Sequence, residues 1–259
     1  MKNRKIREIL KRKNKNPIVC LTAYSKTIAE ILDKYCDIVL VGDSLGMVLY
    51  GMKSTREVTL DMIINHAKSV KKGISKSILV IDMPYQTYRN KKEAYKNAKK
   101  IIKLTKCDAL KLEGGKKIIN VIKYLIKKNI PVMGHVGLLP QSERGKFKFK
   151  GRSSVERKRI IEDARLLSNA GVFAIVIECV EESLAKIISE SIPVPTIGIG
   201  ASKHCDGQIL VTDDLVGLSN FTPKFIRRYS NIKKIINKSV LRFRHDVINK
   251  NFPSRKNIY

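Results

Sequence analysis

The chain of 259 residues lacks tryptophan, long apolar runs and paired cysteine motifs, and it has few acidic residues. No apolar stretch approaches the roughly 18 residues that a membrane-spanning helix needs, and the basic N-terminus is not followed by the apolar region of a signal peptide. The five cysteines form no C-x-x-C pair, which argues against a disulfide framework and a zinc cluster. We therefore expect a soluble cytoplasmic protein with reduced thiols and no membrane partner.

The shortage of acidic residues gives a formal net charge of +29, which raises the question of a nucleic-acid partner. A dedicated binder gathers its basic residues on one face and interleaves aromatic side chains, whereas here lysine is scattered and tryptophan is absent. Isoleucine and asparagine are enriched as well, a pattern typical of AT-rich codon usage. We expect no specific nucleic-acid partner, but a basic nucleic-acid-binding protein stays open as an alternative that predicts tight binding near physiological salt.

Short apolar runs alternate with segments of helical period, the pattern of repeated strand and helix units with a parallel sheet. At 43% hydrophobic residues the chain can bury one sizeable core, so we expect a single domain over residues 1–259. Strands are predicted at residues 18–22, 38–41, 78–81, 109–112, 132–134, 174–177, 196–199 and 208–211. Helices are predicted at residues 25–35, 60–72, 92–105, 116–128, 155–170 and 182–189. Eight strands indicate an α/β fold, a closed (β/α)8 TIM barrel.

Two segments lie outside the eight units. Residues 1–15 have the apolar spacing of one helical face at Ile6, Ile9 and Leu10, so we expect a basic N-terminal helix that covers the bottom of the barrel. Residues 223–259 carry a second helical pattern. We expect this C-terminal helical tail to pack on the barrel or on a neighbouring subunit.

Six of the apolar runs end in a polar or glycine-flanked residue able to do chemistry. Since reactive groups of a parallel barrel lie at the carboxyl ends of its strands, these residues predict one active site assembled from the whole chain. They are Asp43, Asp82, Glu113, His135, Glu178 and Gly200.

The three strand-end carboxylates predict a site for a hard divalent cation. Mg²⁺ is usually held by one or two carboxylates, with water and substrate oxygens completing an octahedron, and Asp43 and Asp82 are the first candidates. Glu113 could complete the coordination sphere directly or through a water. Each carboxylate taken alone could equally cap the following helix. Three of them at equivalent strand ends favour the metal.

Lysine, glutamate and histidine side chains complete the candidate site. Lys111 precedes Glu113 by two residues on one strand, so both side chains point to the same side, and a lysine directed into a barrel needs an anionic partner such as a substrate carboxylate. Glu178 is the candidate general base, because partial burial raises a carboxyl pKa toward neutrality; alternatively it orients a neighbour. His135 could be a metal ligand, an acid-base group, a hydrogen-bond donor or a core histidine.

Ordered motifs between about residues 17 and 228 resemble one known family. They are VGDSLG at residues 41–46, DMP at 82–84, KLEGG at 111–115, GHVGL at 134–138 with PQS at 140–142, IEC at 177–179, and IGIGA at 197–201 followed by DGQ at 206–208. In these blocks the chain resembles ketopantoate hydroxymethyltransferase (3-methyl-2-oxobutanoate hydroxymethyltransferase).

The resemblance implies the first committed step of pantothenate biosynthesis, in which a one-carbon unit passes from 5,10-methylenetetrahydrofolate to 3-methyl-2-oxobutanoate and gives 2-dehydropantoate. It also implies a (β/α)8 barrel, a cytoplasmic homodecamer and Mg²⁺ in the site. Carried over by motif, Asp43 and Asp82 bind the metal and the keto acid, and Glu113 belongs to the metal's coordination sphere. Ser44 and Lys111 contact the keto acid, Glu178 accepts the proton, and His135 donates a hydrogen bond near the transferred group.

The chain departs from the family pattern at three places, all in predicted loops. Met52 and Lys53 stand where relatives often have His-Asp, the stretch 143–150 is about two residues short, and Ser202 replaces a common glycine. These departures concern folate contacts, loop closure and rate. The nearer alternative function, another Mg²⁺-enolate enzyme similar to isocitrate lyase or phosphoenolpyruvate mutase, predicts a K-K-C-G-H-type loop, which the sequence lacks.

Overall fold

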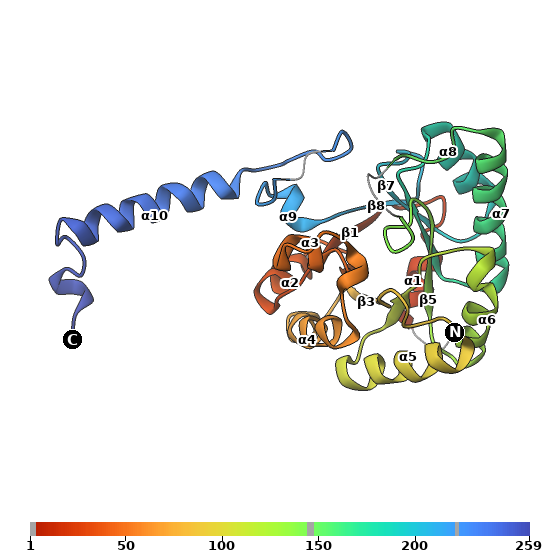
Figure 1. Ribbon diagram of the computed structural model, residues 1–259, viewed down its shortest axis with the longest axis horizontal. Helices are drawn as coiled ribbons and strands as arrows, with labels where there is room; N and C mark the ends of the chain where they lie inside the picture. The colour runs from red at the N-terminus through yellow and green to blue at the C-terminus, as the bar shows by residue number, and fades with distance from the viewer. Residues whose placement is uncertain (1–3, 144–147, 221–222) are drawn as a thin grey trace. The chain divides into compact units, whose positions relative to one another are not determined.

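A computed structural model describes residues 4–143, 148–220 and 223–259. The chain forms two compact units, Met1–Val211 and Thr212–Tyr259 (Figure 1). The first unit contains the strands and most of the helices, and the second is helical.

The first unit is a closed barrel of eight parallel strands that pair in sequence order, with β1 closing against β8. The predicted (β/α)8 barrel is confirmed. The strands are β1 Ile18–Thr22, β2 Ile38–Val41, β3 Ile78–Asp82, β4 Ala109–Lys111, β5 Val132–Gly137, β6 Ala174–Glu178, β7 Thr196–Ile199 and β8 Gly207–Leu210. The helices of this unit are α1 Arg4–Leu10, α2 Lys26–Leu32, α3 Leu45–Tyr50, α4 Leu60–Lys71, α5 Lys91–Thr105, α6 Ile119–Lys127, α7 Ser154–Ala170 and α8 Glu182–Ser191, with 3-10 turns η1 Thr55–Glu57 and η2 Lys116–Ile118.

Strand alternation divides the core into two layers. Ile38 and Leu40 of β2 pack in a cluster inside the barrel, whereas Val39 and Val41 pack against the surrounding helices. The same period holds on the other strands, where the inner cluster contains Ile78, Val80, Ala109, Met133, Ala174 and Val176. On each of these strands, the next inward position lies two residues further along the chain. The period therefore decides which polar side chains face the inside at the barrel mouth.

The N-terminal helix closes the other end of the barrel. Ile6 and Ile9 of α1 are buried in the inner cluster. The helix is shorter than the predicted 1–15, and residues 1–3 lie outside the described residues. It ends early because Asp206 binds the following turn, accepting hydrogen bonds from Lys13 Nζ at 2.9 Å and from the Asn14 backbone N–H at 2.8 Å.

Local capping chemistry sets the ends of the outer helices. Thr59 and Ser153 cap the starts of α4 and α7, where each side chain accepts a backbone N–H bond from the first turn. Gly171 ends α7 at a φ of 90°, in the left-handed region that glycine adopts without steric cost. The caps at Thr59 and Ser153 mark where the chain passes from the preceding loop into each outer helix.

The second unit contains α9 Thr212–Leu215, α10 Ile232–Ile248 and the turn η3 Arg255–Asn257. The helix of the predicted tail 223–259 begins only at Ile232, because Asn231 caps it by accepting from the Lys234 backbone N–H. Within this unit α10 buries none of its side chains. Among the described residues, every helix is too short or too polar to cross a bilayer.

Candidate active site

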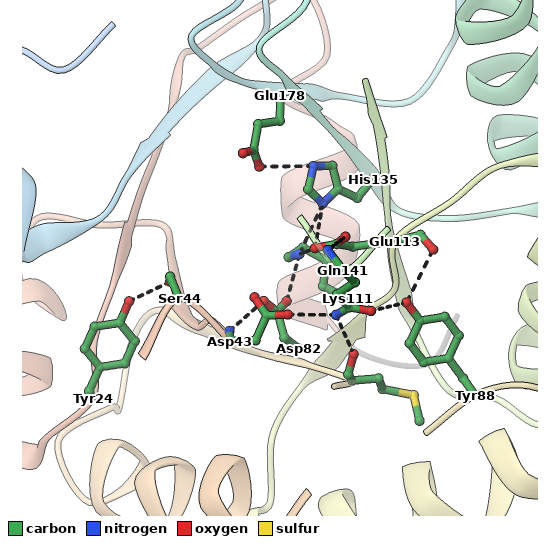
Figure 2. Close-up of polar contacts among 11 residues, drawn as sticks. Tyr24, Asp43, Ser44, Asp82, Tyr88, Lys111, Glu113, His135, Gln141 and Glu178 are labelled. Atoms are coloured by element: carbon green, nitrogen blue, oxygen red, sulfur yellow. Dashed lines mark hydrogen bonds and ion pairs between the residues drawn. The ribbon is translucent and has the colours of Figure 1, made fainter. Parts of the chain in front are cut away.

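The predicted site residues meet at the mouth of the barrel, at the carboxyl ends of β2 to β6 (Figure 2). Asp82, Lys111, His135 and Glu178 lie at the inward positions that follow the inner hydrophobic cluster on their strands. Glu113 occupies the next inward position beyond Lys111, just past the end of β4. All are buried except Glu178, whose side chain is 18% exposed. The structure thus brings together the carboxylates, the lysine and the histidine.

Asp43 and Asp82 are joined through the backbone. The Asp43 N–H donates to Asp82 Oδ2 at 3.0 Å. Gly42 leaves room for the Ser44 hydroxyl, because a methyl group at this position would lie 2.9 Å from Ser44 Oγ. Burial, followed by repulsion from the Asp82 carboxylate, raises the pKa of Asp43 to about 7. Two buried carboxylates at this spacing favour a bound cation or proton.

The Glu113 carboxylate is bound by Gln141 and lies close to His135. Its Oε2 accepts the Gln141 backbone N–H at 3.0 Å, and its Oε1 lies 3.6 Å from His135 Nδ1. Burial raises the pKa of Glu113 well above its usual value, although Lys111 opposes the shift. Within the part of the chain that the structure describes, no three histidine, cysteine, aspartate or glutamate side chains form a group arranged to hold a metal ion.

Lys111 is the buried cation among these carboxylates. Its Nζ lies 3.0 Å from Asp82 Oδ1 and 3.9 Å from Glu113 Oε1. Burial alone would lower the pKa of the ammonium, but the carboxylates of Asp82, Glu113 and Asp43 raise it overall. Lys111 is therefore charged, and an ammonium can only donate hydrogen bonds.

The charge on Lys111 determines the tautomer of His135. Lys111 Nζ lies 3.3 Å from His135 Nδ1, so Nδ1 is the acceptor and the ring proton is on Nε2. Burial and the nearby Lys111 lower the pKa of His135, which keeps the ring neutral. Nε2 lies 3.2 Å from Glu178 Oε2. His135 thus links the buried lysine to the partly exposed carboxylate.

Three side chains at the site escaped the sequence prediction. Tyr24, after β1, pairs its hydroxyl with Ser44 Oγ at 2.7 Å. Gln141, after β5, donates from Nε2 to Asp43 Oδ2 at 2.8 Å, and its Oε1 contacts the Tyr88 hydroxyl. The only signal for any of them was the PQS motif at residues 140–142 that follows the histidine block.

The positions that depart from the family pattern make contacts of their own. The Ser202 hydroxyl donates to Glu182 Oε1 at 2.9 Å, and the Lys53 backbone N–H donates to Glu57 Oε1 at 3.1 Å. The first contact joins the loop after β7 to the start of α8, and the second lies within the segment after β2. In the shortened stretch 143–150, residues 144–147 lie outside the described residues.

Solved structures with the same fold include an enzyme in complex with Mg²⁺. The structure superposes on phosphonopyruvate hydrolase in complex with oxalate and Mg²⁺ with a TM-score of 0.64 at 10% identity, covering 98% of this chain and 93% of that one. It matches 2,3-dimethylmalate lyase, a PEP mutase/isocitrate lyase superfamily member, with a TM-score of 0.60 at 12% identity, covering 79% and 76%. At these identities the likeness shows the fold alone.

Sequence comparison is more specific. The chain is 62% identical over 257 residues to 3-methyl-2-oxobutanoate hydroxymethyltransferase of Pelagibacter ubique (strain HTCC1062), covering 99% of this chain and all of the relative. It is 51% identical over 255 residues to the enzyme of the same name from Phenylobacterium zucineum (strain HLK1), covering 97% and 93%. The family profile described as ketopantoate hydroxymethyltransferase matches residues 3–255. The chain therefore belongs to the ketopantoate hydroxymethyltransferase family.

Proposed function

We propose that the chain transfers a hydroxymethyl group from 5,10-methylenetetrahydrofolate to 3-methyl-2-oxobutanoate, giving 2-dehydropantoate in the first step of pantothenate biosynthesis. The chain is 62% identical over nearly its whole length to a relative named 3-methyl-2-oxobutanoate hydroxymethyltransferase. This identity supports the reaction over those of the structural neighbours. One structural observation carries the mechanism. The partly exposed Glu178 carboxylate lies 3.2 Å from His135 Nε2, and the other ring nitrogen of His135 lies 3.3 Å from the buried Lys111 Nζ. Lys111 in turn pairs with Asp82, which is bonded to the Asp43 backbone. Action in the cytoplasm remains part of the prediction.

The donor set fits Mg²⁺. The ion takes oxygen ligands and commonly needs only one or two carboxylates, so Asp43 and Asp82 suffice as protein ligands. Burial, followed by repulsion from Asp82, raises the pKa of Asp43, and a dication between the two carboxylates would relieve that repulsion. Glu113, held by the Gln141 N–H, would act on the ion through a water. When bound, Mg²⁺ would supply Lewis-acid stabilisation of negative charge developing on the keto-acid oxygens.

The side chains of the site then divide the remaining work. Glu178 removes the proton from C3 of the keto acid, and the His135 Nε2–H orients the carboxylate for this task. The electron pair from the broken C–H bond forms the new bond to the methylene carbon of the folate. Both bonds of that carbon to folate nitrogens break, water supplies the hydroxyl oxygen, and the C3 proton and the remaining proton of water end on the two nitrogens. Lys111 and Ser44 bind the anionic keto acid. His135 Nδ1 also lies 3.6 Å from Glu113 Oε1, so the imidazole is close to the carboxylates of both Glu113 and Glu178.

Deuterium exchange tests substrate, metal and base together. Purified protein with Mg²⁺ in D2O should exchange the C3 proton of 3-methyl-2-oxobutanoate, measured by proton NMR, without any folate. Excess EDTA should stop the exchange, and added Mg²⁺ should restore it. Absence of exchange, together with cleavage of a 2-hydroxy-3-carboxy acid, would instead favour the function of the structural neighbours.

A homodecamer is proposed as the assembly. Helix α10 leaves a continuous set of apolar side chains exposed, which in soluble proteins marks an interaction surface. The set consists of Ile235, Ile236, Val240, Leu241, Phe243, Val247 and Ile248, each at least 45% exposed. Light scattering should give about ten times the 29.4 kDa chain mass, and a chain ending at residue 230 should give a smaller particle. Equal masses for the two would remove α10 from the assembly.

A further inference from the structure

Gln141 uses every polar atom of its side chain, together with its backbone N–H, within the buried site. Nε2 donates to Asp43 Oδ2 at 2.8 Å and to the Met83 carbonyl at 3.0 Å. Oε1 bonds to the Tyr88 hydroxyl, and the backbone N–H donates to Glu113 Oε2 at 3.0 Å. The residue is 2% exposed. A glutamine so fully bonded inside a group of carboxylates is held in one geometry.

The orientation of the amide is forced by its partners. The Met83 carbonyl can only accept a hydrogen bond, so the NH2 group must face it, and the same group then donates to Asp43 Oδ2. Oε1 then faces the Tyr88 hydroxyl, which must be the donor. Tyr88 is itself buried in the loop between β3 and α5. Tyr88 therefore fixes the amide, and the amide fixes the Asp43 carboxylate.

These contacts join the loops that follow four neighbouring strands. Asp43 follows β2, Met83 and Tyr88 follow β3, Glu113 follows β4 and Gln141 follows β5 (Figure 2). The buried carboxylates repel one another, and a neutral amide can hold them without adding a charge that would compete with a cation. A lysine or arginine here would add a second positive charge beside Lys111 and oppose a bound cation.

From this geometry we infer that Gln141, oriented by Tyr88, is a positioning residue that sets the Asp43 carboxylate for Mg²⁺. The inference rests on the proposed function, since it takes Asp43 and Asp82 as the magnesium ligands. Groups that bond to metal ligands typically change metal affinity by about 10 to 100-fold when removed. Gln141 bonds directly to the proposed metal ligand Asp43, and Tyr88 acts on Asp43 only through Gln141.

Magnesium titration of Gln141→Met and Tyr88→Phe tests the inference. Methionine has nearly the length of glutamine but no donors. Calorimetry with Mg²⁺ in the presence of 3-methyl-2-oxobutanoate should show affinity weakened by about 10 to 100-fold for Gln141→Met, and by less for Tyr88→Phe. Exchange of the C3 proton should recover at high Mg²⁺ concentration, because the base is intact. A variant that had merely lost structure would not recover.

Gln208→Met is the matched control. Its amide donates to the Ser202 carbonyl at 2.9 Å, and its side chain lies on the outer, exposed side of β8. The same chemical change there should leave magnesium affinity unchanged. Wild-type affinity in both Gln141→Met and Tyr88→Phe would overturn the inference. If the wild-type protein itself shows no response to Mg²⁺, the proposed function fails instead. Should Gln141→Met not fold, Tyr88→Phe alone decides, because it removes one oxygen atom.

Discussion

Glu178→Gln is expected to slow C3 proton exchange by at least about 10³-fold, within the range that a general base contributes. Glutamine keeps the shape of the side chain, and its Oε1 can still accept the His135 Nε2–H, but the amide cannot take a proton from carbon. In the proposed site the keto acid is bound by other groups, namely the ion, Lys111 and Ser44. Calorimetry should therefore find Mg²⁺-dependent keto-acid binding within a few-fold of wild type while NMR finds exchange lost.

Two further variants make the Glu178 result specific. Glu190→Gln removes an exposed carboxylate that pairs with Lys186 on α8, and it should exchange like wild type. Glu178→Asp keeps the carboxylate but withdraws it by one methylene, so partial exchange is expected. Lost binding with preserved exchange in Glu178→Gln would mean that another group is the base and that Glu178 holds the substrate.

The positions of Asp82, Lys111, His135 and Glu178 could be predicted because they lie on strands. An apolar strand has a period of two, and once its inward residues are known, the polar residue two positions further must face inward as well. Lys111 illustrates this best, since it is one of many lysines in a chain of charge +29 and yet only 5% exposed. Its apolar neighbours Leu110 and Leu112 pointed to burial.

The contacts of Gln141, Tyr88 and Tyr24 could not be predicted in this way. These residues lie on loops, where no period relates sequence position to direction, and a loop's path depends on bonds to other loops. The bond between Gln141 and Asp43 spans 98 positions in the sequence. The direction of the Glu113 carboxylate could not be predicted for the same reason. Glu113 lies just past the end of its strand, and its carboxylate accepts a hydrogen bond from the backbone N–H of Gln141, on another loop.

The N-terminal helix shows what the helical periodicity of the sequence could not predict. The apolar spacing at Ile6 and Ile9 correctly indicated a helix that covers the bottom of the barrel, but its length was set by Asp206, far away in the sequence. Asp206 also accepts the Thr196 backbone N–H at 2.8 Å, so one carboxylate joins the N-terminal turn to β7. A tertiary contact of this kind leaves no local signal.

Lys111→Met should be the most destabilising single change at the site. The ammonium is the buried cation that Asp82, Glu113 and Asp43 share, and removing it leaves carboxylates without compensation in a desolvated site. Breaking a buried ion pair typically costs ~3–5 kcal/mol of unfolding free energy. The keto-acid carboxylate would also lose its partner, so half-saturation of exchange should need about 100-fold more substrate, close to the ~3 kcal/mol of a charged hydrogen bond. Denaturant melts and exchange kinetics measure the two effects separately.

The response of Lys111→Met to magnesium then distinguishes electrostatics from packing. If Lys111→Met loses stability because the positive charge is gone, Mg²⁺ bound between Asp43 and Asp82 would supply part of that charge. The variant should then gain more stability from saturating Mg²⁺ than the wild type does. Lys100→Met is the control, because this lysine pairs with Asp61 on the surface and its removal should change stability by at most about 0.5 kcal/mol. An equal gain from Mg²⁺ in variant and wild type would indicate that methionine disturbs packing, and that the carboxylates of the site are balanced without Lys111.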